Sequence, residues 1–99
     1  MADVVDYSRF KPRLRPFTVY EMIVVVPKII SQHRTYEEAA QACMALNIEF
    51  VEKGGQWADR PFRFSPTAEV INKPHVVEEN GEWTRKVPVG WKDDKIFDA

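Results

Sequence analysis

The side chains that could do chemistry in this sequence include one cysteine, Cys43, and two histidines, His33 and His75. A nucleophilic cysteine needs a nearby base, a cation or a helix N-terminus to hold its thiolate. Cys43 instead falls late in a predicted helix, on the apolar stripe, so we expect a buried and unreactive thiol. The histidines are far apart in the chain, whereas metal ligands usually come at short, regular spacing. The sequence therefore predicts neither a nucleophile nor a metal site.

The adjacent carboxylates of Glu37 and Glu38 have a simpler explanation than acid–base catalysis. They lie in the first turn of the same predicted helix, where negative charge opposes the positive end of the helix dipole. The pair Gly54 and Gly55 is not followed by the lysine and the helix start that a phosphate-binding loop requires. Since no acid, base or nucleophile pairing is recognisable, we expect no catalytic residue, no cofactor and no enzymatic activity.

Cationic residues alternate with aromatic residues in two stretches, 7–15 and 57–64. Arginine pairs with phosphate while an aromatic ring stacks on a base, a combination found in proteins that bind single-stranded nucleic acid. However, Phe62 and Phe64 share one face of a predicted strand, which favours a place in the core, and Arg63 then faces solvent. Nucleic-acid binding through the N-terminal arm and the second stretch is therefore the alternative function.

The function that the sequence favours is a non-enzymatic protein-interaction module, an adaptor or a regulator. Its partner would be another protein or a second copy of the chain, bound by the terminal arms or by an exposed sheet face. Aromatic and arginine residues carry most of the binding energy at the interfaces where they occur. On this basis we select five candidate partner-binding residues: Phe10, Arg13, Arg15, Trp83 and Trp91.

Length and composition indicate one small soluble domain. A chain of 99 residues, 44% of them hydrophobic, can bury one modest core, and its formal net charge of −1 attracts no polyanion. The longest apolar run, residues 22–26, is far shorter than the roughly 20 residues that span a bilayer, so we expect no membrane partner. A single cysteine and an N-terminal segment unlike a secretory signal favour a cytoplasmic location.

The first predicted element is a strand over residues 17–26, which are mostly β-branched or aromatic, with Pro27 at its end. A shorter strand over residues 28–33 would turn back along it. Both faces of the first strand are apolar, which argues for burial on both sides of the sheet. One face carries Val19, Ile23 and Val25, and the other carries Tyr20, Met22 and Val24.

A capping box predicts where the principal helix begins. The Thr35 hydroxyl can accept from the backbone N–H three residues on, and Glu38 can reach back to the N–H of the cap. Apolar residues then recur at helical spacing, so the helix is expected over about residues 36–46. Asn47 is expected to end it in a left-handed conformation.

Two hairpins are expected after the helix. The first joins strands over residues 48–53 and 56–64 at Gly54 and Gly55, and the second pairs residues 76–77 with 83–87 around Asn80 and Gly81. Glycine and asparagine pairs of this kind supply the positive φ angles of tight two-residue turns.

These elements predict an α+β fold, a single domain with a mainly antiparallel sheet, one principal helix and extended terminal segments. The arm would occupy residues 1–16, the core 17–88 and the tail 89–99. One helix can cover only one face of the first strand. We therefore expect the other face to be covered by the terminal segments, with Leu14, Trp91 and Phe97 as the covering residues, or by another chain.

Overall fold

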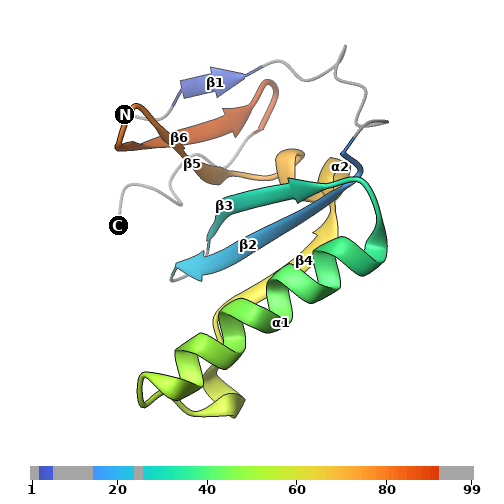
Figure 1. Cartoon of the computed structure of the whole chain (residues 1–99). Coiled ribbons are helices and arrows are strands. Elements are labelled where there is room, and N and C mark those ends of the chain that lie inside the picture. The colour runs from blue at the N-terminus through green and yellow to red at the C-terminus, as the bar shows by residue number, and fades with distance from the viewer. Residues whose placement is uncertain (1–2, 6–14, 24–25, 92–99) are drawn as a thin grey trace.

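In the computed structural model, which describes residues 3–5, 15–23 and 26–91, the chain forms a six-stranded sheet with one long and one short α-helix (Figure 1). The strand order is β1-β6-β5-β3-β2-β4. The predicted α+β class, with a mainly antiparallel sheet and one principal helix, is confirmed. The elements are β1 (Asp3–Val5), β2 (Phe17–Ile23), β3 (Val26–His33), α1 (Tyr36–Glu52), the 3-10 helix η1 (Trp57–Asp59), β4 (Phe62–Pro66), α2 (Thr67–Ile71), β5 (His75–Glu79) and β6 (Glu82–Pro88).

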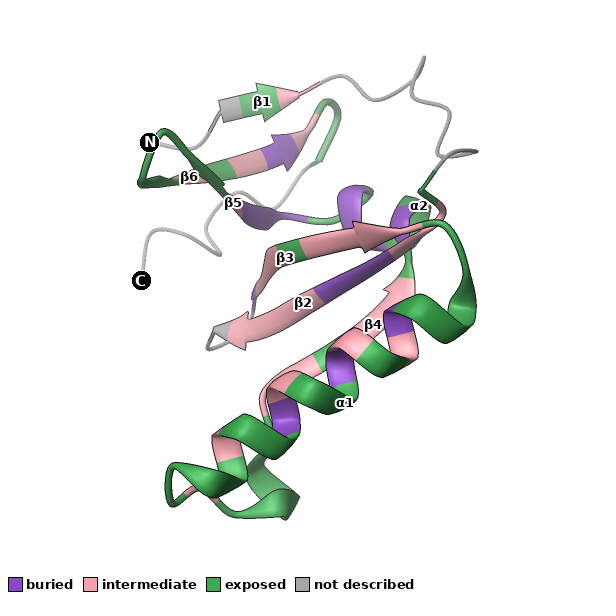
Figure 2. Ribbon diagram, in the orientation of Figure 1, coloured by how far each residue is buried: buried purple, intermediate pink, exposed green. Residues whose placement is uncertain are grey.

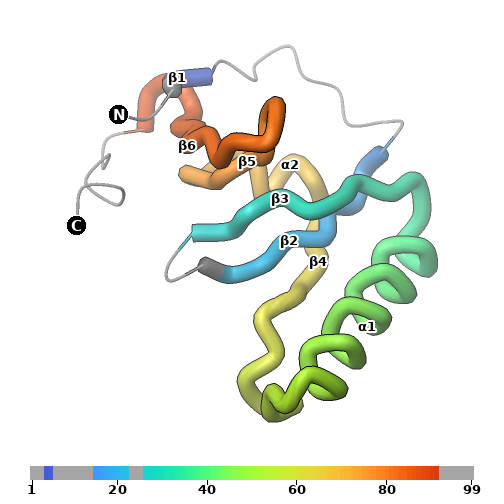
Figure 3. The backbone as a smooth tube through the Cα atoms, turned by 60° about the vertical axis from the view of Figure 1, so that its left-hand side comes forward, coloured from blue at the N-terminus to red at the C-terminus, as the bar shows by residue number. Residues whose placement is uncertain are grey.

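The sheet consists of two three-stranded halves. In the first half, β4 and β3 pair antiparallel with β2, and α1 packs across one face (Figure 1). In the second, which we call the hairpin half, β6 pairs antiparallel with β5 and parallel with β1. The halves meet where β3 runs parallel to β5, with Lys28 opposite Val76 as their paired position. Figure 3 shows the β5–β6 hairpin on the side of β3 away from α1.

The core lies between α1 and the first half of the sheet. Val19 of β2 is buried against Ala39 and Cys43 of α1, and larger side chains such as Phe17 and Leu46 pack around them. The predicted burial of Cys43 is confirmed, since the residue is 7% exposed. Burial raises the pKa of the Cys43 thiol, against the opposing effect of its contact with Asn47, so the reactive thiolate is disfavoured.

The opposite face of β2 is covered at its start by α2, an element that the sequence analysis did not predict. Thr18 is fully buried there, and its Oγ1 lies 2.7 Å from Oγ1 of Thr67, whose hydroxyl donates to the Arg15 carbonyl oxygen at 2.9 Å. Val70 and Ile71 of α2 are also buried. At this end of the strand, the cover that we expected from the terminal segments or a second chain comes from α2.

The strand predicted over residues 17–26 is two strands. β2 ends at Ile23 and β3 begins at Val26, so Pro27 lies inside a strand instead of ending one. The register explains why proline is tolerated. Pro27 lies opposite Met22, whose N–H points away from β3 and donates to the Pro61 carbonyl oxygen at 2.9 Å. The Pro27 nitrogen therefore faces away from β2, and no hydrogen bond to β2 is lost.

The helix begins as predicted but does not end at residue 46. The Thr35 hydroxyl accepts from the Glu38 N–H at 3.2 Å, while the Glu38 carboxylate accepts from the Arg34 N–H instead of the N–H of the cap. Asn47 is not a left-handed stop, because its side chain is buried and hydrogen-bonded within a continuous helix. The strand predicted over residues 48–53 is wrong, since those residues complete α1 and its C-cap.

The hairpin predicted at Gly54 and Gly55 is also wrong. Gly54 has a φ of 103°, and the N–H groups of Gly54 and Gly55 donate to the carbonyl oxygens of Val51 and Phe50 at 3.0 Å. This pair of bonds is the Schellman motif that ends a helix. The strand predicted over residues 56–64 begins later than expected. Residues 57–59 form η1, and the strand, β4, covers Phe62–Pro66.

The second predicted hairpin is confirmed. β5 and β6 pair across Asn80 and Gly81, whose φ angles of 54° and 80° fit a type I′ turn. β1 lies within the segment predicted as an extended arm and adds an edge strand to this half, with the Val89 N–H donating to the Val5 carbonyl oxygen at 2.8 Å.

Candidate docking site

A groove runs between α1 on one side and η1 and β4 on the other, and we call it the α1–β4 groove. Its volume is about 560 Å³. Aromatic residues, a methionine and two arginines line it, among smaller residues. The lining residues are Tyr36, Ala40, Cys43, Met44, Trp57, Ala58, Arg60, Phe62, Arg63 and Phe64.

The helix supplies one wall of the groove because it carries two neighbouring rows of residues at four-residue spacing. Ala39, Cys43 and Asn47 form the row that is buried against the sheet. The next row around the helix begins at Tyr36 and continues through Ala40, Met44 and Ile48. Three of these four side chains are largely exposed, Tyr36 at 58%, Met44 at 49% and Ile48 at 46%. Figure 2 shows exposed positions along α1, in green, between its buried positions, in purple.

Aromatic contacts hold one end of this wall in place. The Tyr36 ring lies edge-on to Phe64, with centroids 5.0 Å apart, and edge-on to Phe17 at 5.9 Å. Such edge-to-face pairs add about 0.5–1.5 kcal/mol beyond the area that they bury. An exposed ring in a fixed position presents a surface that loses little conformational entropy when a ligand binds.

The opposite wall carries the positive charge of the groove. The Arg60 guanidinium lies over the Trp57 ring, 4.5 Å from its centroid, and donates to the Trp57 carbonyl oxygen at 3.0 Å. Arg63 is exposed on the edge strand β4. Among the residues that the structure describes, neither arginine forms an ion pair. Their charges are therefore available to an anionic group from outside the chain.

The outer edge of β4 is largely closed to another strand. Asn47 of α1 accepts from the Phe62 N–H at 3.1 Å and donates to the Phe62 carbonyl oxygen at 3.0 Å, as a neighbouring strand would. Pro66, at the other end of β4, has no N–H to offer. By the alternation of an antiparallel ladder, only Phe64 between them directs its backbone N–H and carbonyl outward.

Of the five predicted partner-binding residues, the structure describes Arg15, Trp83 and Trp91, and none of these three lines the α1–β4 groove. Phe10 and Arg13 lie outside the described residues. Trp83 of β6 is 57% exposed, and its ring lies under the Lys28 ammonium, 4.1 Å from the centroid. Trp91 is exposed beyond β6, and its N–H donates to a carbonyl oxygen at the end of that strand. Neither tryptophan lines the α1–β4 groove.

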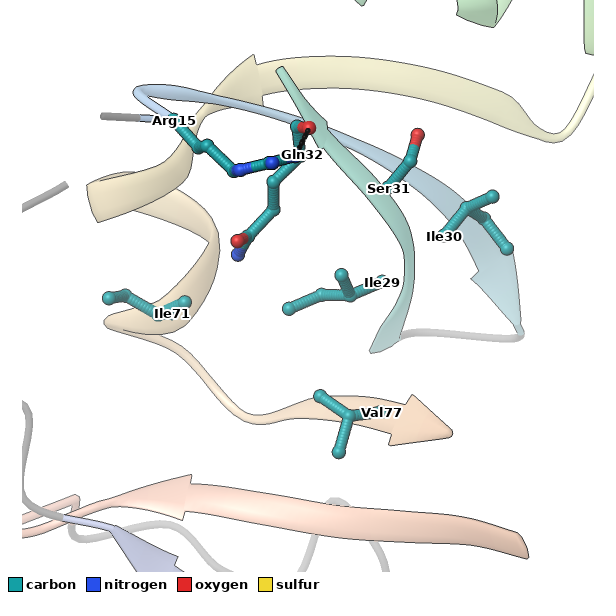
Figure 4. A pocket seen from close by; sticks show the side chains of 7 residues that line it. All are labelled: Arg15, Ile29, Ile30, Ser31, Gln32, Ile71 and Val77. Atoms are coloured by element: carbon teal, nitrogen blue, oxygen red, sulfur yellow. Dashed lines mark hydrogen bonds between the residues drawn. The ribbon is translucent and has the colours of Figure 1, made fainter. Parts of the chain in front are cut away.

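Arg15 lies in a second hollow, of about 490 Å³, between β3, β5 and α2. Figure 4 shows Ile29, Ile71 and Val77 lining this hollow. The Arg15 guanidinium donates to the Gln32 carbonyl oxygen at 3.3 Å. This hollow, which we call the β3–β5 cleft, opens because the ladder between β3 and β5 does not continue beyond Lys28.

One pair of side chains has a contact seen in hydrolytic sites. Ser31 Oγ lies 2.7 Å from Nε2 of His33, which is the distance between a nucleophile and its base. A triad also needs an acid to orient the histidine. In the described part of the chain, no carboxylate bonds to His33 and no three metal-ligating side chains come together. Across the same residues, no helix is long and apolar enough to cross a membrane.

Comparisons with protein-family models, with curated proteins and with solved structures found no match to this chain. The site is therefore assigned from its own residues. The alternation of cationic and aromatic residues in the sequence indicates the stretch from Trp57 to Phe64, but not the exposed wall of α1. The apolar pattern that continues through Ile48 and Val51 is the signal that could have extended the helix.

Proposed function

We propose that this chain is a non-enzymatic protein-interaction module and that its partner docks in the α1–β4 groove. The observation that carries the proposal is the exposed apolar row of α1, of which Tyr36, Ala40 and Met44 line a groove together with Trp57 and Arg60. Contiguous exposed apolar surface on a small domain marks an interaction site. Tryptophan, tyrosine and arginine are also the residues most enriched among the energetic anchors of interfaces.

Docking would stabilise a complex chiefly by removing Tyr36, Met44 and Ile48 from water. Fully burying one such side chain contributes about 1.5–3 kcal/mol, before the entropy of association is subtracted. The row is part of a helix that also supplies the core, so its positions are fixed before a partner arrives. The proposal places the module in the cytoplasm, consistent with the free thiol of Cys43.

The test is a selection of random peptides of about 16 residues, four helical turns, on the full chain. Binding of the selected peptides is then measured by fluorescence anisotropy against two variants. Met44→Glu places a charge in the groove, while Ala45→Glu makes a similar change at an exposed position of α1 outside it. We expect at least about a tenfold loss of affinity for Met44→Glu and none for Ala45→Glu. Failure to select a peptide with this behaviour would overturn the proposal.

Nucleic-acid binding remains the second candidate, favoured by the exposed Trp57 ring beside Arg60. It is separated from protein docking by titrating a fluorescent single-stranded oligonucleotide at two salt concentrations. Binding to phosphates weakens steeply as salt rises, whereas apolar docking is nearly unaffected. Binding that depends on Trp57 and persists at physiological salt would favour nucleic acid.

A further inference from the structure

We infer that the partner segment is an acidic amphipathic helix, which lies along the exposed row of α1 and places carboxylates beside Arg60 and Arg63. This inference rests on the proposed function, because it names the occupant of the same groove. It uses three observations: the spacing of the row, the closed edge of β4 and the two arginines without ion pairs.

The spacing of the row favours a helix as the occupant. Residues at four-residue intervals form a ridge, and a ridge of this kind packs into the groove between the corresponding residues of a second helix. From Tyr36 to Ile48 the ridge covers 13 residues, so its ends lie 12 steps apart, or about 18 Å at 1.5 Å per residue. That length matches a little over three turns of a partner helix, which would present apolar side chains at intervals of three and four residues.

The edge of β4 argues against the other common way of binding a peptide, in which an extended segment adds a strand to a sheet. Strand addition draws its affinity from successive backbone hydrogen bonds. Asn47 already bonds the outward groups of Phe62, and Pro66 lacks an N–H. One residue, Phe64, cannot hold a strand in register. A partner must therefore bind through its side chains.

The arginines select the charge of the partner. Arg60 is held in place by its contacts with Trp57, so it loses less side-chain entropy when a carboxylate binds than a free arginine would. Arginine pairs with carboxylates through two parallel hydrogen bonds, in a geometry that lysine does not provide. Acidic side chains flanking the apolar ones would meet Arg60 in the groove and could reach Arg63 past the edge of β4, whereas basic side chains would be repelled.

The experiment repeats the peptide selection on two forms of the full chain, the natural one and the double variant Arg60→Glu/Arg63→Glu. We expect peptides selected on the natural chain to be rich in aspartate and glutamate, and peptides selected on the double variant to be rich in lysine and arginine. A representative acidic peptide should lose at least about tenfold in affinity for the double variant. It should lose none for Lys73→Glu, a charge reversal at an exposed position outside the groove.

Circular dichroism of the representative peptide supplies the second readout, and helical signal should appear on binding. Peptides that respond to Met44→Glu but show no acidic preference, or bind without becoming helical, would overturn this inference and leave the proposed function standing. Peptides that do not respond to Met44→Glu, or the absence of any binder, would overturn both. An oligonucleotide that displaces the peptide at physiological salt would show that the acidic ligand is a nucleic acid and would overturn the helical partner.

Discussion

Val19 in the first half of the sheet and Val87 in the hairpin half are both buried, but their surroundings differ. Val19 in the first half is enclosed by α1 and the side chains around it. Val87 in the hairpin half is also buried, yet its cross-strand partner Val4 is 68% exposed and no helix of the described chain packs over that face. The helix that completes the core of the first half also presents the α1–β4 groove.

The junction between the halves relies on side chains as well as on its backbone pairing. Lys28 of β3 reaches across to the hairpin, where its ammonium lies over the Trp83 ring and 4.0 Å from the Glu78 carboxylate. If the halves differ in packing as described, they should also differ in how they respond to substitution.

Replacing Asn47 by alanine should have the largest effect on the first half. The substitution leaves the outward N–H and carbonyl of Phe62 without their partners. Each unpaired buried polar group costs about 1–3 kcal/mol, so the free energy of unfolding should fall by roughly 2–4 kcal/mol. Urea denaturation measures this change, and the exposed Gln41→Ala on the same helix is the matched control. An equal effect of both variants would contradict the role assigned to Asn47.

The variants Val19→Ala and Val87→Ala compare the halves directly, since the same atoms are removed from two buried valines. We expect Val19→Ala to lower the free energy of unfolding by about 2 kcal/mol and Val87→Ala by less, because α1 packs against Val19, whereas in the described part of the chain no helix packs over β6. Amide hydrogen exchange should show faster opening of β5 and β6 in Val87→Ala, with β2 unchanged. Equal losses, with exchange accelerated throughout, would mean that the halves unfold as one unit.

The hairpin half should also respond to acid through His75. Burial lowers the pKa of His75 below 6.5, although its Nδ1–H donates to the Lys73 carbonyl oxygen, which acts in the opposite direction. The unfolded chain therefore binds this proton more readily than the folded one. Stability should fall as the pH drops below about 6.5, by at most about 1.4 kcal/mol per pH unit, until the folded pKa is reached. The contribution should be absent in His75→Gln, measured over the same pH range.

The smallest effect is expected at the exposed end of α1. Lys53 and Glu49 form an ion pair at 2.8 Å, which raises the pKa of the lysine and lowers that of the glutamate. Both side chains are largely in water, where such pairs contribute little. The thermal midpoint of Lys53→Ala should match that of the natural chain at physiological salt. A clear shift would mean that the helix end depends on this pair.

The parts of the fold that could be predicted from the sequence are those set by neighbouring residues. The turn at Asn80 and Gly81 and the cap at Thr35 each depend on the conformation of a few adjacent residues. The end of the helix does not. Asn47 is typical of a helix stop until its partner Phe62, fifteen residues further on, is known. The pair Gly54 and Gly55 predicts a positive φ angle, which Gly54 adopts, but that conformation serves a helix end as well as a hairpin.

The candidate site was less predictable than the fold because it depends on where the helix ends. Once a strand was predicted from Ile48 onward, the exposed row of α1 could not be recognised as a continuous surface. Trp57 and Arg60 were noted for their types, yet their position across from Met44 follows from the turn formed by η1. Trp83 and Trp91 were selected by type alone, and the structure places them away from the groove.

The parallel pairing of β1 with β6 has a mechanical consequence. Among the described residues, β1 is the first strand and β6 the last, and they run in the same direction. A force that pulls the two ends of the chain apart therefore draws β1 and β6 along each other in opposite directions, which loads their hydrogen bonds together in shear instead of one after another. β1 and β4 are the opposite edges of the sheet, so a tether attached through β1 and β6 transmits its load at the edge farthest from the α1–β4 groove.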